Sequence, residues 1–368
     1  MTRPAIAHIR LDAFRHNYRV AKAMHGGKAL AVVKANAYGH GAVQCAQAIA
    51  NEADGFAVAC LEEAIELRQA GIRKPILLLE GFFEAAELPE IVANDCWVVL
   101  HTQWQIDIFL ATKLAKPLHV WLKMDSGMHR VGLAPVSYQQ AFNSLAGHAN
   151  TANIVLMSHF ANADNLKSNH TKQQISVFQQ AVQTLKFGEV SLANSAAILG
   201  WPQSYNHWSR PGIMLYGADP LAANVLNQLA KRVIDEHQQS LRAVMQLSSK
   251  IISIHNILKG ESIGYGSIFT ADKDTIVGVV ACGYADGYPR SATHAPVAVD
   301  GKLTKVIGRV SMDMLFVDLT DIVTAKIGSN VELWGDQVSA NDVANAAGTI
   351  AYELFCNVKR VQFKHSDS

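Results

Sequence analysis

The sequence lacks the features that would direct a protein to a membrane, to a nucleic acid or out of the cell. No stretch of the 368 residues approaches the ~18 consecutive apolar residues needed to cross a bilayer. The amino-terminal segment MTRPAIAHIRLDAF has no apolar signal-peptide core. The net charge is only +1, so no excess of charge favours nucleic acid or an anionic membrane. We therefore expect a cytoplasmic protein with no membrane or nucleic-acid partner.

Several common catalytic motifs are also missing. The sequence has no G-x-x-x-x-G-K-[ST] phosphate loop, no H-E-x-x-H zinc site and no G-x-S-x-G nucleophile turn. Its 5 cysteines are widely spaced and form no C-x-x-C pair, which is typical of reduced thiols. Its 15 histidines show no convincing metal-ligand spacing, so we expect no metal. Nucleotide hydrolysis, zinc proteolysis and serine hydrolysis are therefore disfavoured.

Residues 28–217 alternate between apolar runs typical of strands and amphipathic helices. Strands that alternate with helices pair in parallel, and eight of them in under about 200 residues close a barrel. An open, doubly wound sheet is the alternative, but it usually has fewer strands, and no G-x-G-x-x-G follows the first one. The expected strands begin near Ala29, Phe56, Ile76, Trp97, Leu118, Ile154, Val190 and Ile213.

Beyond about residue 232 the segments become short, rich in Val and Ile, and interrupted by Gly, Asp and Asn. We predict a (β/α)8 TIM-type barrel over residues 8–231 and a mostly β carboxy-terminal domain over residues 232–368, against which residues 1–7 also pack. Within the barrel, Thr171 and Gln174 have the spacing of a capping box. In the second domain one helix is expected after Ser339, with an apolar stripe of Val343, Ala346, Ala347, Ile350 and Leu354.

Lys34 directly follows the apolar run of residues 29–33, at the end of an expected buried strand. An amine against an apolar wall is less stable as an ammonium ion and more nucleophilic, which suits a Schiff base. A solvated lysine that closes a strand is the alternative. Other polar residues also follow or precede the expected strands, at the face where barrels carry their active sites. They are Asn36, Tyr38, Lys123, Arg130, His159, Asn194, Ser195 and Arg210.

Eight segments, taken in order, resemble alanine racemase over nearly the whole chain. They are AVVKANAYGHG (31–41), LKMDSGMHRVG (122–132), MSHFA (157–161), LANSAA (192–197), SRPGIMLYG (209–217), IGYGSIF (263–269), GYADGYPR (283–290) and GRVSMD (308–313). The resemblance implies interconversion of L-alanine and D-alanine by a homodimer that uses pyridoxal 5'-phosphate (PLP). It also implies a barrel followed by a β-rich domain.

The resemblance implies a role for each matching residue. Lys34 would hold PLP and act as one base, and Tyr265 would act as the second base from the opposite face of the substrate. Arg210 would face the pyridine nitrogen with support from His159. Arg130 and Met312 would bind the substrate, and Tyr265 and Met312 would come from the partner subunit. The remaining cofactor-binding residues would be Tyr38, Asn194, Ser195, Gly212, Ile213 and Tyr352.

The resemblance also reaches residues outside the reacting centre. Lys123 matches a lysine that is carbamylated in many relatives. Two departures from the family pattern are His129, where relatives often have glycine, and Ser311, where some have cysteine. The entrance to the site would be lined by Asp164, Tyr284, Arg290 and Arg309.

Three other functions are considered beside alanine racemisation. A racemase of broader specificity, for example for serine, tends to be exported, which the absence of a leader disfavours. A PLP-dependent decarboxylase of similar architecture usually pairs an acidic residue with the ring nitrogen, where this chain has Arg210. A non-catalytic PLP carrier would not need Tyr265. The reaction could supply D-alanine for peptidoglycan precursors or degrade alanine for carbon.

Overall fold

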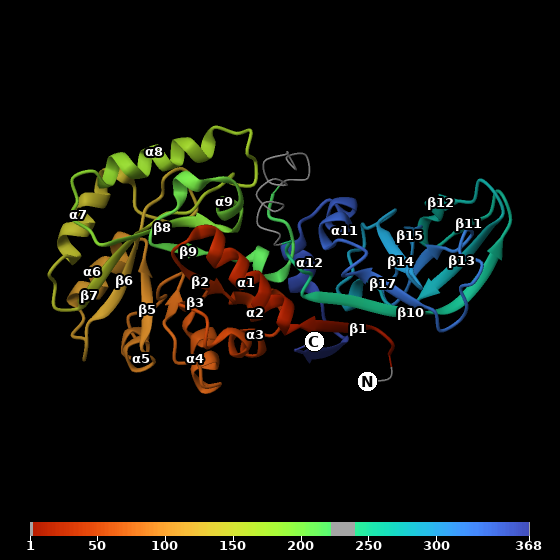
Figure 1. Ribbon diagram of the computed structural model, residues 1–368, viewed down its shortest axis with the longest axis horizontal. Coiled ribbons are helices and arrows are strands. Elements are labelled where there is room, and N and C mark those ends of the chain that lie inside the picture. Colours follow the sequence, from red (N-terminus) through yellow and green to blue (C-terminus); the bar gives the residue numbers. More distant parts are fainter. Residues whose placement is uncertain (1–2, 222–239, 368) are drawn as a thin grey trace.

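The computed structural model describes residues 3–221 and 240–367, which form two parts arranged end to end (Figure 1). One part is a barrel of parallel strands with helices around it, and the other is mostly β-sheet. The prediction of a TIM-type barrel followed by a mostly β domain is confirmed. The predicted boundary between residues 231 and 232 lies outside the described residues.

The barrel closes through eight parallel strands in sequence order. The strands are β2 (Lys28–Val32), β3 (Gly55–Val58), β4 (Ile76–Leu78), β5 (Cys96–Leu100), β6 (Leu118–Lys123), β7 (Thr151–Met157), β8 (Glu189–Asn194) and β9 (Trp208–Arg210). The helices of this part are α1 (Leu11–His25), α2 (Lys34–Gly39), α3 (Ala42–Ile49), α4 (Leu61–Gln69), α5 (Glu87–Ala93), α6 (Gln103–Ala111), α7 (Pro135–Leu145), α8 (His170–Val182) and α9 (Ser195–Gly200), with 3-10 turns η1 (Pro202–Ser204) and η2 (Ile213–Tyr216).

The eighth strand was predicted at the wrong residues. It runs over Trp208–Arg210, and the segment expected to start it at Ile213 is a 3-10 turn. Pro211 has no N–H to donate to a strand ladder, so it is suited to end the strand. The chain then folds back, and Leu215 N donates to Gly212 O at 2.8 Å.

Two helix details also differ from the prediction. Helix α8 begins after Asn169 without a side-chain cap, so the predicted capping box is wrong. The Gln174 amide instead points into the core, where it donates to the carbonyl of His159 at 3.0 Å. The single helix expected after Ser339 is two helices, because Gly348 ends the first one in the left-handed conformation (φ +72°) and Ile350 is extended and 60% exposed.

The second part is built on an eight-stranded sheet with the order β13-β16-β15-β14-β17-β10-β1-β18. Strand β1 (Ile6–Arg10), from the start of the chain, lies between the long strand β10 (Met245–Ile257) and the carboxy-terminal strand β18 (Gln362–Ser366). The other elements are β11 (Ser262–Ile263), η4 (Tyr265–Ser267), β12 (Phe269–Thr270), β13 (Thr275–Val280), η5 (Tyr284–Asp286), β14 (Pro296–Val299), β15 (Lys302–Ile307), β16 (Leu315–Asp318), β17 (Asn330–Trp334), α11 (Ala340–Ala347) and α12 (Ala351–Asn357).

The cysteines and helices bear on the expectations about the environment of the chain. All of the cysteines are free, and Cys45, Cys96 and Cys282 are buried, as expected for reduced thiols. Among the described residues, no helix is both long and apolar enough to span a membrane.

Three tryptophans fill the barrel core away from the strand end that carries Lys34. Trp97 stacks on Trp121 with ring centroids 6.2 Å apart, and Trp208 meets both rings edge-on at 5.6 and 5.8 Å. Glu189 accepts a hydrogen bond from the Trp208 indole at 3.0 Å, and Lys28 lies over the same ring. This cluster stabilises the barrel that positions the residues at its other end.

We predict that Trp121→Ala lowers the free energy of unfolding by about 3–5 kcal/mol, because it removes a fully buried ring and leaves a cavity between two others. Trp104→Ala is the matched control, since Trp104 is 50% exposed, and it should cost less than about 1 kcal/mol. Thermal melting followed by circular dichroism measures both variants. Equal destabilisation would contradict the assignment of Trp121 to the barrel core.

Candidate active site

A cavity of about 630 Å³ opens at the carboxyl ends of the barrel strands. This volume is typical of a site for a small ligand. The cavity brings together most of the residues that the sequence singled out, although they come from widely separated segments. These residues are Lys34, Tyr38, Lys123, Arg130, His159, Asn194, Ser195, Arg210, Gly212, Ile213 and Tyr352.

The backbone that follows Lys34 adopts an unusual conformation. Residues 35–38 all have φ between 51° and 53°, so helix α2 contains a left-handed turn. Left-handed helical geometry costs an L-residue roughly 1–2 kcal/mol, so this turn needs strong support. Part of that support is Glu63, whose carboxylate accepts hydrogen bonds from Ala35 N and from Ala59 N, both at 2.7 Å. The turn carries Tyr38 back into the cavity beside Lys34.

Tyr38, Ser195 and Gly212 form one end of the cavity. The Ser195 hydroxyl accepts a hydrogen bond from Gly212 N at 2.8 Å. A Cβ atom at Gly212 would lie only 2.7 Å from the Tyr38 hydroxyl, so only glycine leaves this space open. Burial raises the pKa of Tyr38, which keeps its hydroxyl protonated and able to donate. Hydroxyls and backbone groups at a glycine turn suit an anion such as phosphate.

Arg210 lies in the wall of the cavity and is only 4% exposed. It donates to the carbonyl of Ser158 at 2.6 Å and to the hydroxyl of Ser191. In the part of the chain that the structure describes, no carboxylate forms an ion pair with Arg210. Burial lowers the pKa of Arg210 to about 10, so it remains a cation at neutral pH. The cavity therefore carries a fixed positive charge held by neutral partners.

Burial and the positive charges of the cavity lower the pKa values of Lys123 and His159. Burial, together with the charges of Arg210, Arg130 and Lys34, lowers the pKa of Lys123 to about 8. Burial and the charge of Arg210 hold the pKa of His159 well below its usual range, so this ring is neutral. The arrangement favours a guest that brings negative charge.

Arg130 follows a tight turn organised by Asp125. One oxygen of this carboxylate accepts hydrogen bonds from the N–H groups of Gly127, Met128 and His129 at 2.9 to 3.0 Å. The other oxygen lies 3.1 Å from Nδ1 of His129. His129 has φ +56°, a left-handed conformation that favours glycine.

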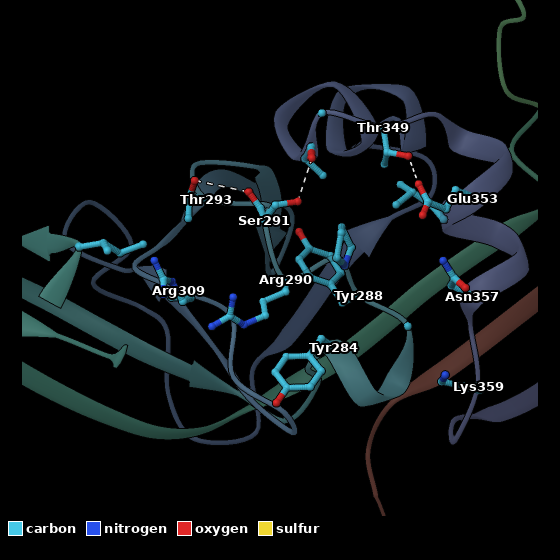
Figure 2. Close-up of a pocket in the computed structure, with 16 residues that line it drawn as sticks. Tyr284, Tyr288, Arg290, Ser291, Thr293, Arg309, Thr349, Glu353, Asn357 and Lys359 are labelled. Carbon is cyan, nitrogen blue, oxygen red and sulfur yellow. Dashed lines mark hydrogen bonds between the residues drawn. The ribbon is translucent and has the colours of Figure 1, made fainter. Parts of the chain in front are cut away.

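The predicted entrance residues lie outside this cavity. Asp164 lines a neighbouring cavity of about 620 Å³, which shares His159, Asn194, Ile213 and Tyr352 with the first. The pocket in Figure 2 belongs to the second part of the chain and measures about 820 Å³. Figure 2 shows Arg290 and Arg309 in this pocket, with the ring of Tyr284 close to Arg290.

Tyr265 and Met312 lie on the surface of the second part, where they are 69% and 53% exposed. Tyr265 starts the turn η4 between β11 and β12, and Figure 1 shows these two strands at the end of the molecule farthest from the barrel. Neither residue lines the cavity that contains Lys34. A single chain therefore does not bring Lys34 and Tyr265 together.

The cavity also contains residues that the sequence reasoning missed. Glu80 and His101 line it, and His101 Nε2 lies 3.0 Å from the carbonyl of Glu80. Both follow barrel strands, β4 and β5, so reading past those two strand ends would have found them. Cys356 also lines the cavity, one helical turn after Tyr352 on α12. The i, i+4 spacing from Tyr352 was the available signal.

Comparisons with known proteins point to one family. Residues 9–220 match the model described as alanine racemase, N-terminal domain, and residues 244–365 match that of alanine racemase, C-terminal domain. The chain is 57% identical over 360 residues to an alanine racemase of Pseudomonas entomophila, covering 98% of both chains. It is 56% identical over 360 residues to a catabolic alanine racemase of Pseudomonas putida, again covering 98% of both.

Solved structures agree with the sequence comparisons. The biosynthetic alanine racemase from Pseudomonas aeruginosa superimposes with a TM-score of 0.93 at 45% identity, covering 99% of this chain and 100% of that one. The alanine racemase from Bartonella henselae with covalently bound pyridoxal phosphate gives a TM-score of 0.86 at 28% identity, covering 99% of both.

In protein that carries Lys123 as the free amine, we predict that Lys123→Met increases the free energy of unfolding at pH 7 by up to about 3 kcal/mol, because it removes a buried amine whose pKa is held below its ordinary value. The pKa is about 8 in the folded chain and 10.5 ordinarily, so the unfolded chain binds more protons between these values. The loss of unfolding free energy that Lys123 causes is therefore largest below pH 8 and disappears towards pH 10.5.

Denaturant unfolding at pH 7 and at pH 10 measures the gain, with the exposed Lys113→Met as the control. The gain from Lys123→Met should shrink at the higher pH, and the control should change little at either. A gain that does not depend on pH would contradict the charge argument.

Proposed function

The chain belongs to the alanine racemase family and interconverts L-alanine and D-alanine, and we propose that it does so with PLP in the barrel cavity and with residues from two subunits. The observation that carries this proposal is the cavity itself. It combines a strand-end lysine, a buried arginine and an open cradle of hydroxyl groups in one cavity.

The donors of the cavity fit PLP. Tyr38, Ser195 and the backbone at Gly212 and Ile213 would hold the phosphate, in the space that a Cβ atom at Gly212 would fill. The hydroxyl of Tyr352 would add a donor, since its ring lies 5.6 Å from that of Tyr38. Lys34 would hold the cofactor covalently, and His159 and Asn194 would line its faces. When bound, PLP supplies an electron-withdrawing ring that makes the Cα–H of the amino acid acidic.

Arg210 supports racemisation over other reactions of the same cofactor. An arginine donates hydrogen bonds but keeps its proton, so it would face the pyridine nitrogen without protonating it. Its charge is held by Ser158 and Ser191 rather than by a carboxylate. A decarboxylase of this architecture would usually have an acidic residue there. This choice leaves the ring a weaker electron sink, which favours rapid return of the proton to Cα.

Inversion of Cα needs one proton carrier on each face of the substrate. We assign these roles to the Lys34 amine and the Tyr265 hydroxyl. Tyr265 is exposed and lies outside the cavity of its own chain, so the second carrier would come from a partner subunit. Ile268, Met312 and Met314 of the same domain are also exposed apolar side chains, which is typical of an interface. A two-fold dimer would then complete two identical sites.

Arg130 would bind the carboxylate of the substrate, together with Met312 of the partner subunit. Lys123 lies near Arg130, and the lowered pKa of its amine leaves much of it neutral near pH 8. A neutral amine can react with carbon dioxide. The resulting carbamate would replace a buried positive charge by a negative one that could orient Arg130. We therefore propose that Lys123 is carbamylated, which the intact mass of the protein would reveal.

We place the entrance where two subunits meet. Asp164 and Tyr352 line the cavity beside the active site, while Arg290 and Arg309 line the pocket of the second domain. Opposite charges would then face each other at the mouth of each site. Tyr284 would complete this mouth from the second domain.

The test uses two variants that should be inactive alone, Lys34→Ala and Tyr265→Phe. When the two are unfolded and refolded together, half of the dimers combine both chains, and one of the two sites in each has an intact lysine and an intact tyrosine. We predict a recovery of about one quarter of wild-type activity, measured as D-alanine formed from L-alanine in the presence of PLP.

The control refolds each variant by itself, which should give no recovery. If both residues acted within one chain, the mixture would also stay inactive, and the shared site would be excluded. A wild-type chain that binds PLP without forming D-alanine would instead favour a carrier, and equal turnover of serine would favour a broader racemase.

A further inference from the structure

His40 ends the left-handed turn that follows Lys34, and its ring contacts that turn directly. Nδ1 lies 3.0 Å from the carbonyl oxygen of Ala37 and 3.0 Å from that of Tyr38. Both partners are acceptors, so Nδ1 must carry the hydrogen that is donated to them. Burial lowers the pKa of His40 to about 4, which keeps the ring neutral. His40 therefore donates to the carbonyls at the end of the strained turn.

The ring of His40 is locked in place by aromatic neighbours. It is fully buried, and it lies 4.6 Å from the ring of Tyr216 and 4.9 Å from that of Phe355. Tyr216 also stacks on Tyr38 at 4.7 Å. A Cβ atom at Gly39 would lie only 2.2 Å from the carbonyl of Phe355, so the turn packs tightly against helix α12. Contacts with two aromatic rings therefore restrict the movement of the His40 ring away from the carbonyls.

A second histidine supports the first from the other domain. His365 belongs to the carboxy-terminal strand β18, and its Nε2 lies 2.9 Å from the carbonyl oxygen of His40. Because that partner is a carbonyl, Nε2 of His365 is the donor. The turn beside Lys34 is thus connected to both α12 and β18, which follow the barrel by more than a hundred residues in the sequence.

We propose that His40 is a positioning residue that holds the left-handed turn of residues 35–38, and with it the Tyr38 hydroxyl, in the geometry that binds the PLP phosphate. His365 supports His40 from the second domain. This inference rests on the proposed function, because it assumes that PLP binds beside Tyr38. The competing explanation is that His40 only fills the core.

Amides separate the two explanations, because they mimic one ring nitrogen each. The side-chain nitrogen of asparagine can occupy the place of Nδ1, and that of glutamine the place of Nε2. His40→Asn therefore retains the donor that the turn uses, whereas His40→Gln moves it away. Both variants remove the aromatic ring, so a role in core packing alone would make asparagine, the smaller residue, the more harmful of the two.

We predict that His40→Gln weakens PLP binding by about five- to tenfold, the effect of one lost neutral hydrogen bond. His40→Asn also loses the ring and its packing, so it is compared with wild type at temperatures equally far below their melting temperatures. Under these conditions it should bind PLP within about twofold of wild type. The dissociation constant comes from titrating PLP into apoprotein and following the absorbance of the bound cofactor. Borohydride trapping at Lys34 shows how much cofactor is correctly attached.

A second pair of variants keeps the test decisive if the buried changes prevent folding. His365→Gln retains a donor near Nε2, and His365→Asn does not. His365→Asn should weaken PLP binding, whereas His365→Gln should bind PLP as wild type does. Turnover at saturating PLP should change by less than about twofold in both variants.

Equal loss of PLP affinity in the asparagine and glutamine variants at both positions would overturn this inference alone. A wild-type chain that binds no PLP would overturn the proposed function, and this inference with it.

Discussion

The site depends on one electrostatic constraint, the gathering of positive charge at the mouth of the barrel. Lys34, Lys123, Arg130 and Arg210 line one cavity, and among the described residues that line it Glu80 is the one acidic residue. Lys123 and Arg210 are buried, and burying a charge is costly, so a guest that brings negative charge would stabilise the cavity. The cofactor phosphate and the substrate carboxylate would bring that negative charge. The lowered pKa values of Lys123 and Arg210 show that their charged forms are disfavoured in the cavity, and burial is the largest cause.

The fold brings these residues together by joining distant segments around the short left-handed turn of residues 35–38. The left-handed residues 35–38 place Tyr38 against Gly212 and next to Lys34. Glu63 supports the turn from the barrel, and α12 packs against it from the second domain. The strain is therefore opposed by contacts from both domains. The second domain also carries Tyr265 on its far surface, so in the proposed mechanism a single chain would be incomplete and a pair of chains would be sufficient.

Much of this could be read from the sequence, and the misses have physical reasons. Hydrophobic periodicity located seven barrel strands, but the eighth, Trp208–Arg210, contains a serine and an arginine and therefore does not register as an apolar run. The helix after Ser339 was predicted as continuous because its apolar spacing is regular, yet Gly348 ends it. The left-handed turn could not be foreseen, since Ala35 and Ala37 are good helix formers and tertiary contacts override that preference.

Comparison of PLP with pyridoxal, which lacks the phosphate, tests the charge argument most directly. The melting temperature of the apoprotein is measured at equal concentrations of each ligand, since a ligand that binds only the folded chain stabilises it more the more tightly it binds. The account predicts a rise of several degrees with PLP and a much smaller one with pyridoxal. Equal rises would show that the cavity recognises the aldehyde and the ring alone, and that the gathered positive charge does not require an anion.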